Sequence, residues 1–332
     1  MKQFHIYGLG AALVDTEIQV TDEELGTMGV EKGLMTLVDE ARQGELLDHL
    51  EGHLVHSKRA SGGSACNSVI AASYFGADVF FSCRVADDDN GHFYLADLQR
   101  AGVTTDPHDG TAGITGKCLV MISPDAERSM NTYLGISETF SVSDLNLAAI
   151  ADSQYIYIEG YLVTSGCSRE AAIVARQHAE QSGVKTALSL SDPGIVNFFR
   201  DGLAAMIGNK VDLLFCNEAE ATGWAQTDSL DEAVESLKSI ARSFAITRGE
   251  RGALVYDGSQ VLTIQAAAVT AIDTNGAGDM FAGAFLYAIT HGHDYATAGR
   301  LAALAAGAVV ADYGPRLPAG RHRELLRKVI GK

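Results

Sequence analysis

The chain has 332 residues, of which 47% are hydrophobic and 20% charged, so it can form a large folded domain and is too apolar to be disordered. Its 25 basic and 42 acidic residues give a net charge of −17, which argues against nucleic-acid or anionic-membrane partners, because binding phosphates needs clustered cations. Five widely spaced cysteines without a Cys-x-x-Cys pair indicate neither disulfides nor a zinc site, and a cytoplasmic location fits best. The longest apolar run, Leu301 to Ala311, is too short to span a bilayer.

The first part of the chain alternates between apolar and polar residues. This pattern predicts strands with one solvated face and no convincing helix between them. The predicted strands are Phe4–Gly8, Glu17–Val20, Leu34–Val38 and Leu54–Lys58, with a later pair at Lys117–Ser123 and Arg128–Leu134. We expect the segments at about 15–60 and 112–136 to form a small, partly exposed sheet that serves as a lid.

From Ser64 onward, predicted helices and strands alternate. The helices are Ala65–Phe75, His92–Ala101, Arg169–Gln181, Leu230–Ala241, Ala277–His291 and Tyr295–Val310. The strands are Asp78–Arg84, Tyr155–Glu159, Lys185–Ser189, Val211–Cys216 and Ser243–Thr247. This alternation is typical of a mostly parallel sheet with helices on both faces. We therefore predict one α/β domain over residues 1–332, with the lid built from excursions of the same chain.

Three segments approach known binding motifs without completing them. The segment that starts at Gly8 has Leu13 where a dinucleotide fingerprint needs its third glycine. The acidic segment from Ala86 to Gly91 has alanine at the first ligand position of a calcium loop, so we interpret it as the polar start of a helix. A solvated helix face is favoured over a metal site for three histidines: His49, His53 and His56.

One glycine-rich segment, Asp273–Asp279, stands at the start of a predicted helix. Thr274 or Asn275 can cap this helix, which leaves the backbone N–H groups of its first turn with almost no side chain around them. The three small residues concerned are Gly276, Ala277 and Gly278. Such a helix start binds an oxyanion or a phosphate.

Asp279 lies in this same first turn. Its carboxylate can accept a proton from an alcohol late in the reaction, as a new O–P bond forms. The alternative is structural: the glycines let the helix pack closely, and Asp279 is an ordinary first-turn charge. The two interpretations are about equal on these residues alone.

The sequence of Asp273–Asp279 resembles the C-terminal signature of the ribokinase-like (PfkB) family of sugar and nucleoside kinases. Other segments are similar to further landmarks of that family, in the same order along the chain. These are Ser61–Asn67 (the sugar-binding turn), Val85–Gly91 (the loop after it), Asn217–Glu220 (the Asn-x-x-Glu element) and Thr247–Gly252 (the nucleotide loop). The lid segment Asp125–Gly135 is similar to adenosine-kinase-like members.

This resemblance implies a three-layer α/β/α sandwich with a β-sheet lid, and ATP-dependent phosphorylation of a primary hydroxyl of a nucleoside, such as adenosine, or of a ribose-type sugar. It implies Asp279 as the catalytic base, and the amides of Gly276, Ala277 and Gly278 as the anion hole. The residues implied to bind the substrate are Asp15, Gly62, Gly63, Asn67 and Arg128. The residues implied to bind ATP are Asn217, Glu220, Thr247, Gly249, Gly252 and Asp273, with Glu220 holding Mg²⁺ through water.

Several alternatives stay open on the sequence. Asp15 can be a strand-end carboxylate and Asn67 a helix cap, and Ala11 stands where many relatives closest to adenosine kinase have asparagine. Tyr133 can stack on a base or pack within the lid. The acceptor can be another sugar, such as fructose or a keto-deoxy sugar acid, and the protein can be a non-catalytic sensor or a nucleotide-linked oxidoreductase. A monovalent cation and a homodimer through the half-exposed lid sheet are also open.

Overall fold

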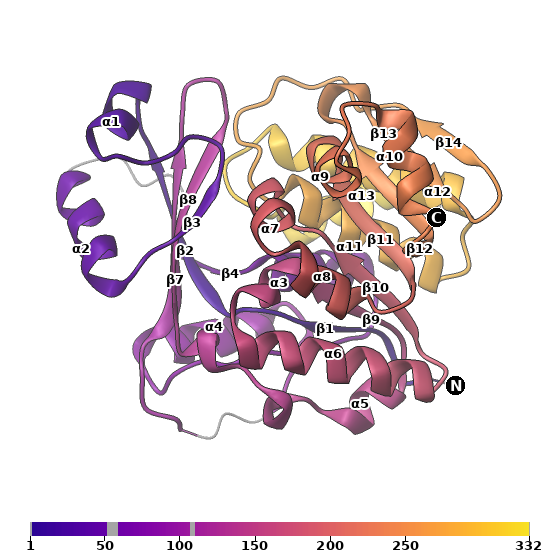
Figure 1. The fold of residues 1–332 in the computed structure, drawn as a ribbon, viewed down its shortest axis with the longest axis horizontal. Helices are drawn as coiled ribbons and strands as arrows, with labels where there is room; N and C mark the ends of the chain where they lie inside the picture. Colours follow the sequence, from indigo (N-terminus) through magenta and orange to yellow (C-terminus); the bar gives the residue numbers. More distant parts are fainter. Residues whose placement is uncertain (1, 52–58, 107–109, 332) are drawn as a thin grey trace.

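The computed structural model describes residues 2–51, 59–106 and 110–331. Within these residues, the larger of two sheets has nine strands (Figure 1). In spatial order they are β14 (Val261–Ile264), β13 (Ala253–Tyr256), β12 (Ala241–Thr247), β11 (Val211–Asn217), β10 (Lys185–Ser189), β9 (Ser153–Glu159), β1 (Phe4–Leu9), β5 (Val79–Ser82) and β6 (Val103–Thr104). The sheet is parallel except for the hairpin of β13 and β14, which closes one edge.

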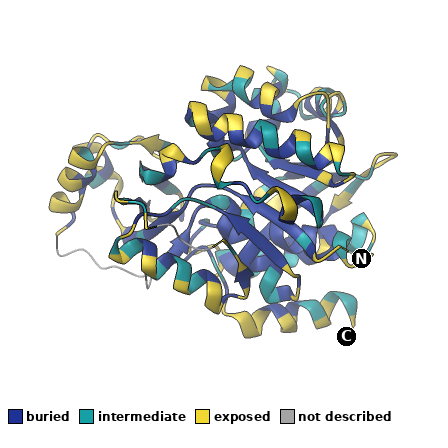
Figure 2. Cartoon of the chain, turned by 90° about the horizontal axis from the view of Figure 1, so that it is seen from below, coloured by how far each residue is buried: buried dark blue, intermediate teal, exposed yellow. Residues whose placement is uncertain are grey.

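The central strands are buried on both faces, which explains their nearly continuous apolar sequences. In β9, Tyr155 and Tyr157 point into one apolar core, whereas Ile156 and Ile158 point into the other. Figure 2 shows these strands as buried ribbon between helices whose outward faces are exposed. The central sheet therefore separates two cores.

Helices cover both faces of this sheet. One face carries α3 (Ser64–Phe75), α4 (Asp89–Arg100), α11 (Ala277–Thr290), α12 (Tyr295–Val310) and α13 (Ala319–Ile330). The other carries α5 (Leu147–Ala151), α6 (Gly166–Gln181), α7 (Pro193–Phe198), α8 (Arg200–Ile207), α9 (Glu218–Ala225) and α10 (Leu230–Leu237). Short 3₁₀ helices lie at Ile136–Thr139, Val142–Asp144, Gly160–Thr164 and Gly249–Arg251. The predicted α/β class, a mostly parallel sheet in a three-layer sandwich, is confirmed.

A second, smaller sheet stands beside the core, at the left of Figure 1. Its strands, in order, are β3 (Met35–Leu37), β8 (Arg128–Gly135), β7 (Thr115–Ile122), β2 (Leu13–Gln19) and β4 (Ala60–Gly62). The strand predicted at Leu54–Lys58 lies outside the described residues, as do His53 and His56. We call this sheet, with the two helices that pack on it, the lid.

Those helices, α1 (Asp22–Thr27) and α2 (Glu40–His49), contradict the prediction that this part of the chain has no helix. Thr21 and Glu24 form a reciprocal capping box at the start of α1, and Asp39 caps α2. Both helices cover the sheet face that points away from the core (Figure 1). They bury an apolar cluster there: Ile18, Val20, Leu25, Met28, Leu46, Leu50, Leu119 and Met121. The helices thus cover one face of the lid sheet, whereas β3 and half of β8 stay partly exposed, and a dimer through the lid remains a prediction.

Two more local predictions have clear outcomes. Helix α10 ends at Leu237, four residues before the predicted end, because the chain must turn before Ala241 starts β12 beside Val211. The acidic segment before α4 is the polar start of a helix, since the Asp88 side chain accepts a hydrogen bond from Gly91 N at 2.7 Å. No helix in the described part of the chain is long and apolar enough to cross a membrane.

Candidate functional site

A cavity of about 570 Å³ lies between the lid and the core, where strands β9 to β12 reach their carboxyl ends. In open α/β sheets, ligands bind at this edge. Its walls include all of the predicted site residues except Gly62 and Asp273. Segments far apart in the sequence therefore meet in one site.

Asp279 faces this cavity from the first turn of α11. Its Oδ1 accepts a hydrogen bond from Ser64 Oγ at 2.6 Å, and its Oδ2 accepts one from Asn67 Nδ2 at 3.1 Å. Burial raises the pKa of Asp279, whereas these two donors and the charge of Arg128 lower it. The carboxylate is therefore held in a fixed orientation and is a better proton acceptor than an exposed aspartate.

The turn that precedes α11 is shaped by Gly276. This residue has φ = 73°, and a Cβ there would lie 2.4 Å from the Pro315 carbonyl oxygen, so no larger residue fits. The prediction that Thr274 or Asn275 caps the helix is wrong, because Gly276 is the N-cap and no side chain caps it.

Both predicted caps bind the lid instead. Thr274 Oγ1 donates to the carbonyl of Ala126, at the tip of the β7–β8 turn, at 3.0 Å. Asn275 Nδ2 donates to Glu17 Oε1, on β2, at 3.1 Å. The anion-hole turn and the lid are thus joined at two points.

The uncapped helix start leaves backbone donors available. Ala277 N donates to the Thr274 carbonyl at 3.3 Å, so this amide already takes part in the turn. Within the described residues, the N–H groups of Gly276, Gly278 and Asp279 donate to no other group. Together with the positive end of the helix dipole, they form a site for an anion.

Two groups near Asp279 are buried without the partners that they need. Asp15 is 7% exposed, and none of the described residues donates a hydrogen bond to its carboxylate. Burial and the charges of Glu17 and Asp279 raise its pKa to about 8, whereas Arg316 lowers it. Asn67 Oδ1 is also buried with no hydrogen-bond partner in the described part of the chain. Both residues line the cavity, so their oxygens are available to a polar ligand or to water there.

The two glycines before α3 are both required for lack of space around them, and Gly63 also lines the cavity. A Cβ at Gly62 would lie 2.2 Å from the Asp15 carboxyl, so Gly62 makes room for that side chain from outside the cavity wall. Gly63 has φ = 94°, and a Cβ there would lie 2.2 Å from the Ala11 carbonyl oxygen. The structure therefore places Gly62 behind Asp15, not among the cavity-lining residues.

Asp273 is also away from the cavity wall. It is 0% exposed, its Oδ1 accepts from Asn275 N at 2.8 Å, and its Oδ2 accepts from Gly314 N at 2.9 Å. Both oxygens are used to fix the turn. Asp273 therefore fixes the conformation of the loop before α11. This is a different role from the contact with ATP that the resemblance implies for Asp273.

Asn217 and Glu220 form a capping box at the start of α9. Glu220 Oε1 accepts from Asn217 Nδ2 at 2.6 Å, and Oε2 accepts from Asn217 N at 3.1 Å. Burial raises the pKa of Glu220 to about 7, and Arg128 opposes this rise. Three more predicted residues line the same end of the cavity: Thr247, Gly249 and Gly252.

The lid contributes an apolar wall to the cavity. Its apolar lining residues are Leu13, Met35, Leu37, Cys118, Val120, Met130 and Leu134. On β8, the residues that line the cavity are every second one from Arg128 to Leu134, so Tyr133 lies on the opposite face. The alternative in which Tyr133 stacks on a bound base is therefore wrong.

Sequence reasoning assigned no role to two residues that shape the site. Ser64 lies inside a motif that was recognised, and its hydroxyl contacts Asp279. Glu159 accepts hydrogen bonds from Ala11 N at 2.7 Å and Ala65 N at 2.8 Å, and burial raises its pKa to about 7. The sequence does place Glu159 at the end of a predicted strand, and residues at the carboxyl ends of such strands often line a ligand site.

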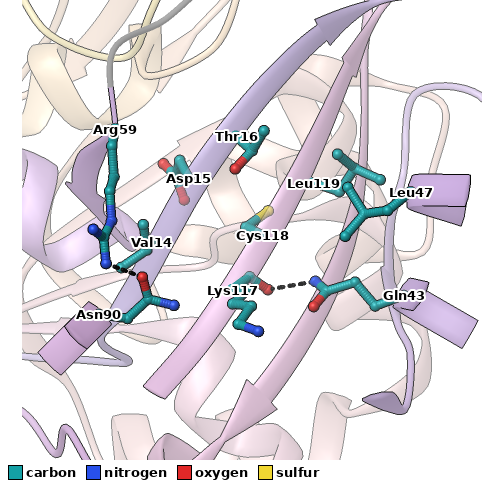
Figure 3. Close-up of a pocket in the computed structure, with 10 residues that line it drawn as sticks. All are labelled: Val14, Asp15, Thr16, Gln43, Leu47, Arg59, Asn90, Lys117, Cys118 and Leu119. Atoms are coloured by element: carbon teal, nitrogen blue, oxygen red, sulfur yellow. Dashed lines mark hydrogen bonds between the residues drawn. The ribbon is translucent and has the colours of Figure 1, made fainter. Parts of the chain in front are cut away.

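A smaller cavity of about 220 Å³ lies under α2, near Arg59 and Asn90 (Figure 3). Gln43 of α2 reaches across it and donates to the Lys117 carbonyl at 3.2 Å. Asp15 and Cys118 line both cavities. At these positions, β2 and β7 thus form a thin partition between the two cavities.

An uncapped helix start beside an oriented carboxylate, at the carboxyl edge of a doubly covered sheet, provides the electrostatic stabilisation and the proton acceptor that phosphoryl transfer to a small molecule needs. The family model of the pfkB family carbohydrate kinases matches residues 40–320. The chain belongs to this family, and it is a kinase of the adenosine-kinase-like branch.

Individual relatives are similar to this chain along nearly its whole length. The sequence is 28% identical to adenosine kinase of Saccharomyces cerevisiae, over 93% of this chain and 96% of that protein. The fold matches a probable sugar kinase of Rhizobium etli CFN 42 with a TM-score of 0.93 and 32% identity, over 99% of each chain. It matches adenosine kinase of Sinorhizobium meliloti with a TM-score of 0.91 and 31% identity, over 97% of this chain and 99% of that one.

Proposed function

We propose that this protein transfers the γ-phosphoryl group of ATP to the primary hydroxyl of a ribonucleoside, with adenosine as the first candidate. The observation that carries this proposal is that one face of the lid sheet presents both an apolar wall and the carboxylate of Asp15, to which no described residue donates a hydrogen bond. A ribonucleoside has both complementary parts, a sugar diol and a flat, weakly polar base. The relatives of S. cerevisiae and S. meliloti that are named adenosine kinase support the same choice.

At the substrate end, Asp15 accepts hydrogen bonds from sugar hydroxyls, and Asn67 Oδ1 accepts another. The base then lies against the lid wall, where each Å² of apolar surface removed from water contributes about 25 cal/mol. A free pentose or hexose gains less, because its hydroxyls would face Val120, Met130 and Leu134.

At the reacting centre, Asp279 takes the proton of the primary hydroxyl as the O–P bond forms. Ser64 and Asn67 keep its carboxylate turned toward the acceptor. The N–H groups of Gly278 and Asp279 stabilise charge on the transferred group, and Arg128 adds positive charge from the lid. In this proposal, lid closure excludes water from the site.

At the other end, Thr247, Gly249 and Gly252 line the space for ATP. Asn217 and Glu220 fit Mg²⁺ bound through water, since both Glu220 oxygens already accept hydrogen bonds and Mg²⁺ keeps much of its water shell. Bound there, Mg²⁺ would neutralise phosphate charge. The proposal assigns no residue to a monovalent cation.

The test is a coupled assay of ADP release with ATP, Mg²⁺ and a panel of acceptors: adenosine, other nucleosides, ribose, fructose and a keto-deoxy sugar acid. We expect adenosine or another ribonucleoside to give the highest kcat/KM. A higher kcat/KM for a free sugar would overturn the nucleoside assignment. Thermal stabilisation by a ligand that never yields ADP would favour a non-catalytic sensor.

A further inference from the structure

We propose that Arg316 is a positioning residue of the substrate end, which clamps strand β4 behind Asp15 and balances the buried negative charge around that carboxylate. This inference rests on the proposed function, because it gives Asp15 the role of binding the acceptor. Arg316 lies in the short segment between α12 and α13, far from Asp15 in the sequence.

The side chain of Arg316 is 12% exposed and makes two contacts. It donates to the Ser61 carbonyl at 2.7 Å and to Asp97 Oδ2 at 3.2 Å. The same Asp97 oxygen accepts from Ser61 Oγ at 2.6 Å and from Ser61 N at 3.2 Å. Arg316 and Asp97 thus bind the carbonyl, the amide and the hydroxyl of Ser61, which fixes this residue in place.

Ser61 is the middle residue of β4, which pairs with β2 so that Ser61 lies opposite Val14. The next residue, Gly62, lies against the Asp15 carboxyl so closely that a Cβ would sit 2.2 Å from it. A shift of β4 therefore closes or opens the space that Asp15 occupies. The clamp on Ser61 keeps this spacing constant.

Arg316 also acts by charge. The charges that act most on Asp15 are those of Glu17 of the same strand, Arg316 and Asp279 of α11. The other titratable groups that line the two cavities beside Asp15 include Cys118, Arg59, Lys117 and Arg128. The two carboxylates raise the pKa of Asp15, and Arg316 lowers it. Without Arg316, a larger fraction of Asp15 is protonated near neutral pH, and a protonated Asp15 accepts fewer hydrogen bonds from sugar hydroxyls.

The segment that carries Arg316 reaches the phosphoryl end as well. Gly314 N donates to Asp273 Oδ2 at 2.9 Å, and Pro315 packs against Gly276. Residues 314–316 therefore run from the anion-hole turn to the strand behind Asp15. This continuity gives a short mechanical connection between the two ends of the site.

The decisive variant is Arg316→Met, which removes the charge and the donors but keeps most of the side-chain length. We expect the KM for the acceptor to rise about ten- to a hundredfold, with kcat and the KM for ATP changed much less. We also expect this rise in KM to shrink as the pH is raised from 6 to 9, because Asp15 regains its charge. Arg316→Lys, which keeps the charge, should restore the pH profile but only part of the affinity.

Arg100→Met is the matched control. Arg100 donates to Asp97 Oδ1 at 3.0 Å, but its side chain is 64% exposed and it does not contact Ser61. We expect wild-type kinetic constants from this variant. If Arg316→Met does not fold, as judged by thermal melting, Asp97→Asn loosens the same clamp from its other side and should raise the acceptor KM in the same way.

A ligand-free measurement separates this inference from the proposed function. Hydrogen exchange at the backbone amides of residues 60–64 should be faster in Arg316→Met than in the wild type and in Arg100→Met. Unchanged exchange together with an unchanged acceptor KM would overturn the role of Arg316. A wild-type protein that phosphorylates no nucleoside or sugar, yet shows the exchange difference, would overturn the proposed function and leave the clamp standing.

Discussion

The hydroxyl of Ser64 lies 2.6 Å from Oδ1 of Asp279, although 215 positions separate the two residues in the chain. Ser64 starts α3 and Asp279 lies in the first turn of α11, and these two helices pack against each other on one face of the sheet. The contact therefore joins the first turn of α3, which also carries Asn67, to the proposed base.

Asp279→Asn should abolish proton acceptance while preserving the shape of the site. We expect kcat to fall roughly 10²–10⁴-fold, the usual contribution of a general base. Binding of ATP and of the acceptor, measured by calorimetry, should change little. Turnover close to that of the wild type would show that Asp279 is not the base.

Ser64→Ala removes one donor from the Asp279 carboxylate. Because that donor lowers the pKa of Asp279, its loss raises this pKa further. The base must be ionised to act, so the acidic limb of the kcat–pH profile should move to higher pH, with kcat at neutral pH down about tenfold. An unshifted acidic limb would contradict this role. Ser73→Ala is a suitable control, because Ser73 lies on the same helix as Ser64 but does not line the cavity, and its hydroxyl donates to the Ala101 carbonyl at the end of α4.

The sequence predicted those parts of the fold that local patterns encode. Strands β9 to β12 and helix α11 follow from runs of apolar residues and from one glycine-rich motif. The sequence analysis predicts neither α1 nor α2, because apolar and polar residues alternate in the flanking segments and this alternation favours strands. The capping box of Thr21 and Glu24 is a local signal for α1. Arg316 and Ser61 are 255 positions apart in the chain. The periodicity of apolar residues predicts helices and strands, but it does not predict a contact between two such distant residues.

A contact between distant residues also explains why the predicted helix cap of α11 is wrong. Thr274 and Asn275 are residue types that often cap helices, so local propensity favours that role. In the folded chain, Thr274 instead reaches Ala126, 148 positions away, because the lid offers a carbonyl there. A tertiary partner therefore outweighed the local preference.

Thr274→Val tests this tie between the lid and the anion-hole turn. The variant keeps the side-chain shape and loses the hydrogen bond from Oγ1 to the Ala126 carbonyl, whereas the longer one from Thr274 N, at 3.4 Å, remains. The closed lid should therefore be less populated. We expect the acceptor KM to rise about two- to tenfold, with more ATP hydrolysis in the absence of acceptor. Thr290→Val is the control, because its hydroxyl binds the Leu286 carbonyl of its own helix at 2.8 Å. Equal effects of the two substitutions would argue against the tie.

His322 should make the stability of the fold depend on pH. It is 0% exposed on α13, packs against Phe75 and Tyr74, and its burial lowers its pKa from the usual 6.5 to about 4. Between these values the unfolded chain binds a proton that the folded chain does not, so stability falls as the pH drops from 6.5 to 4. The full loss from this group is roughly 3 kcal/mol.

Replacing His322 with leucine should therefore flatten the dependence of Tm on pH between 4 and 6.5, relative to the wild type. His49→Gln is the control, because His49 is exposed on α2 and should leave the slope unchanged. The same slope in His322→Leu and in the wild type would show that burial does not lower the pKa of His322 in the folded protein.

Gly276 and Gly278 should differ sharply when each is replaced by alanine. At Gly276, φ is 73° and a Cβ would lie 2.4 Å from the Pro315 carbonyl oxygen, so Gly276→Ala combines backbone strain with a steric clash. These two costs predict a loss of roughly 2–6 kcal/mol in the free energy of unfolding.

At Gly278, a Cβ would meet nothing within 4 Å, so Gly278→Ala should fold normally. Its methyl group still stands beside an N–H group that the mechanism uses for the phosphoryl group, so we expect kcat to fall while Tm, followed by thermal melting, stays near the wild-type value. Equal losses of Tm in both variants would contradict the geometry of this turn.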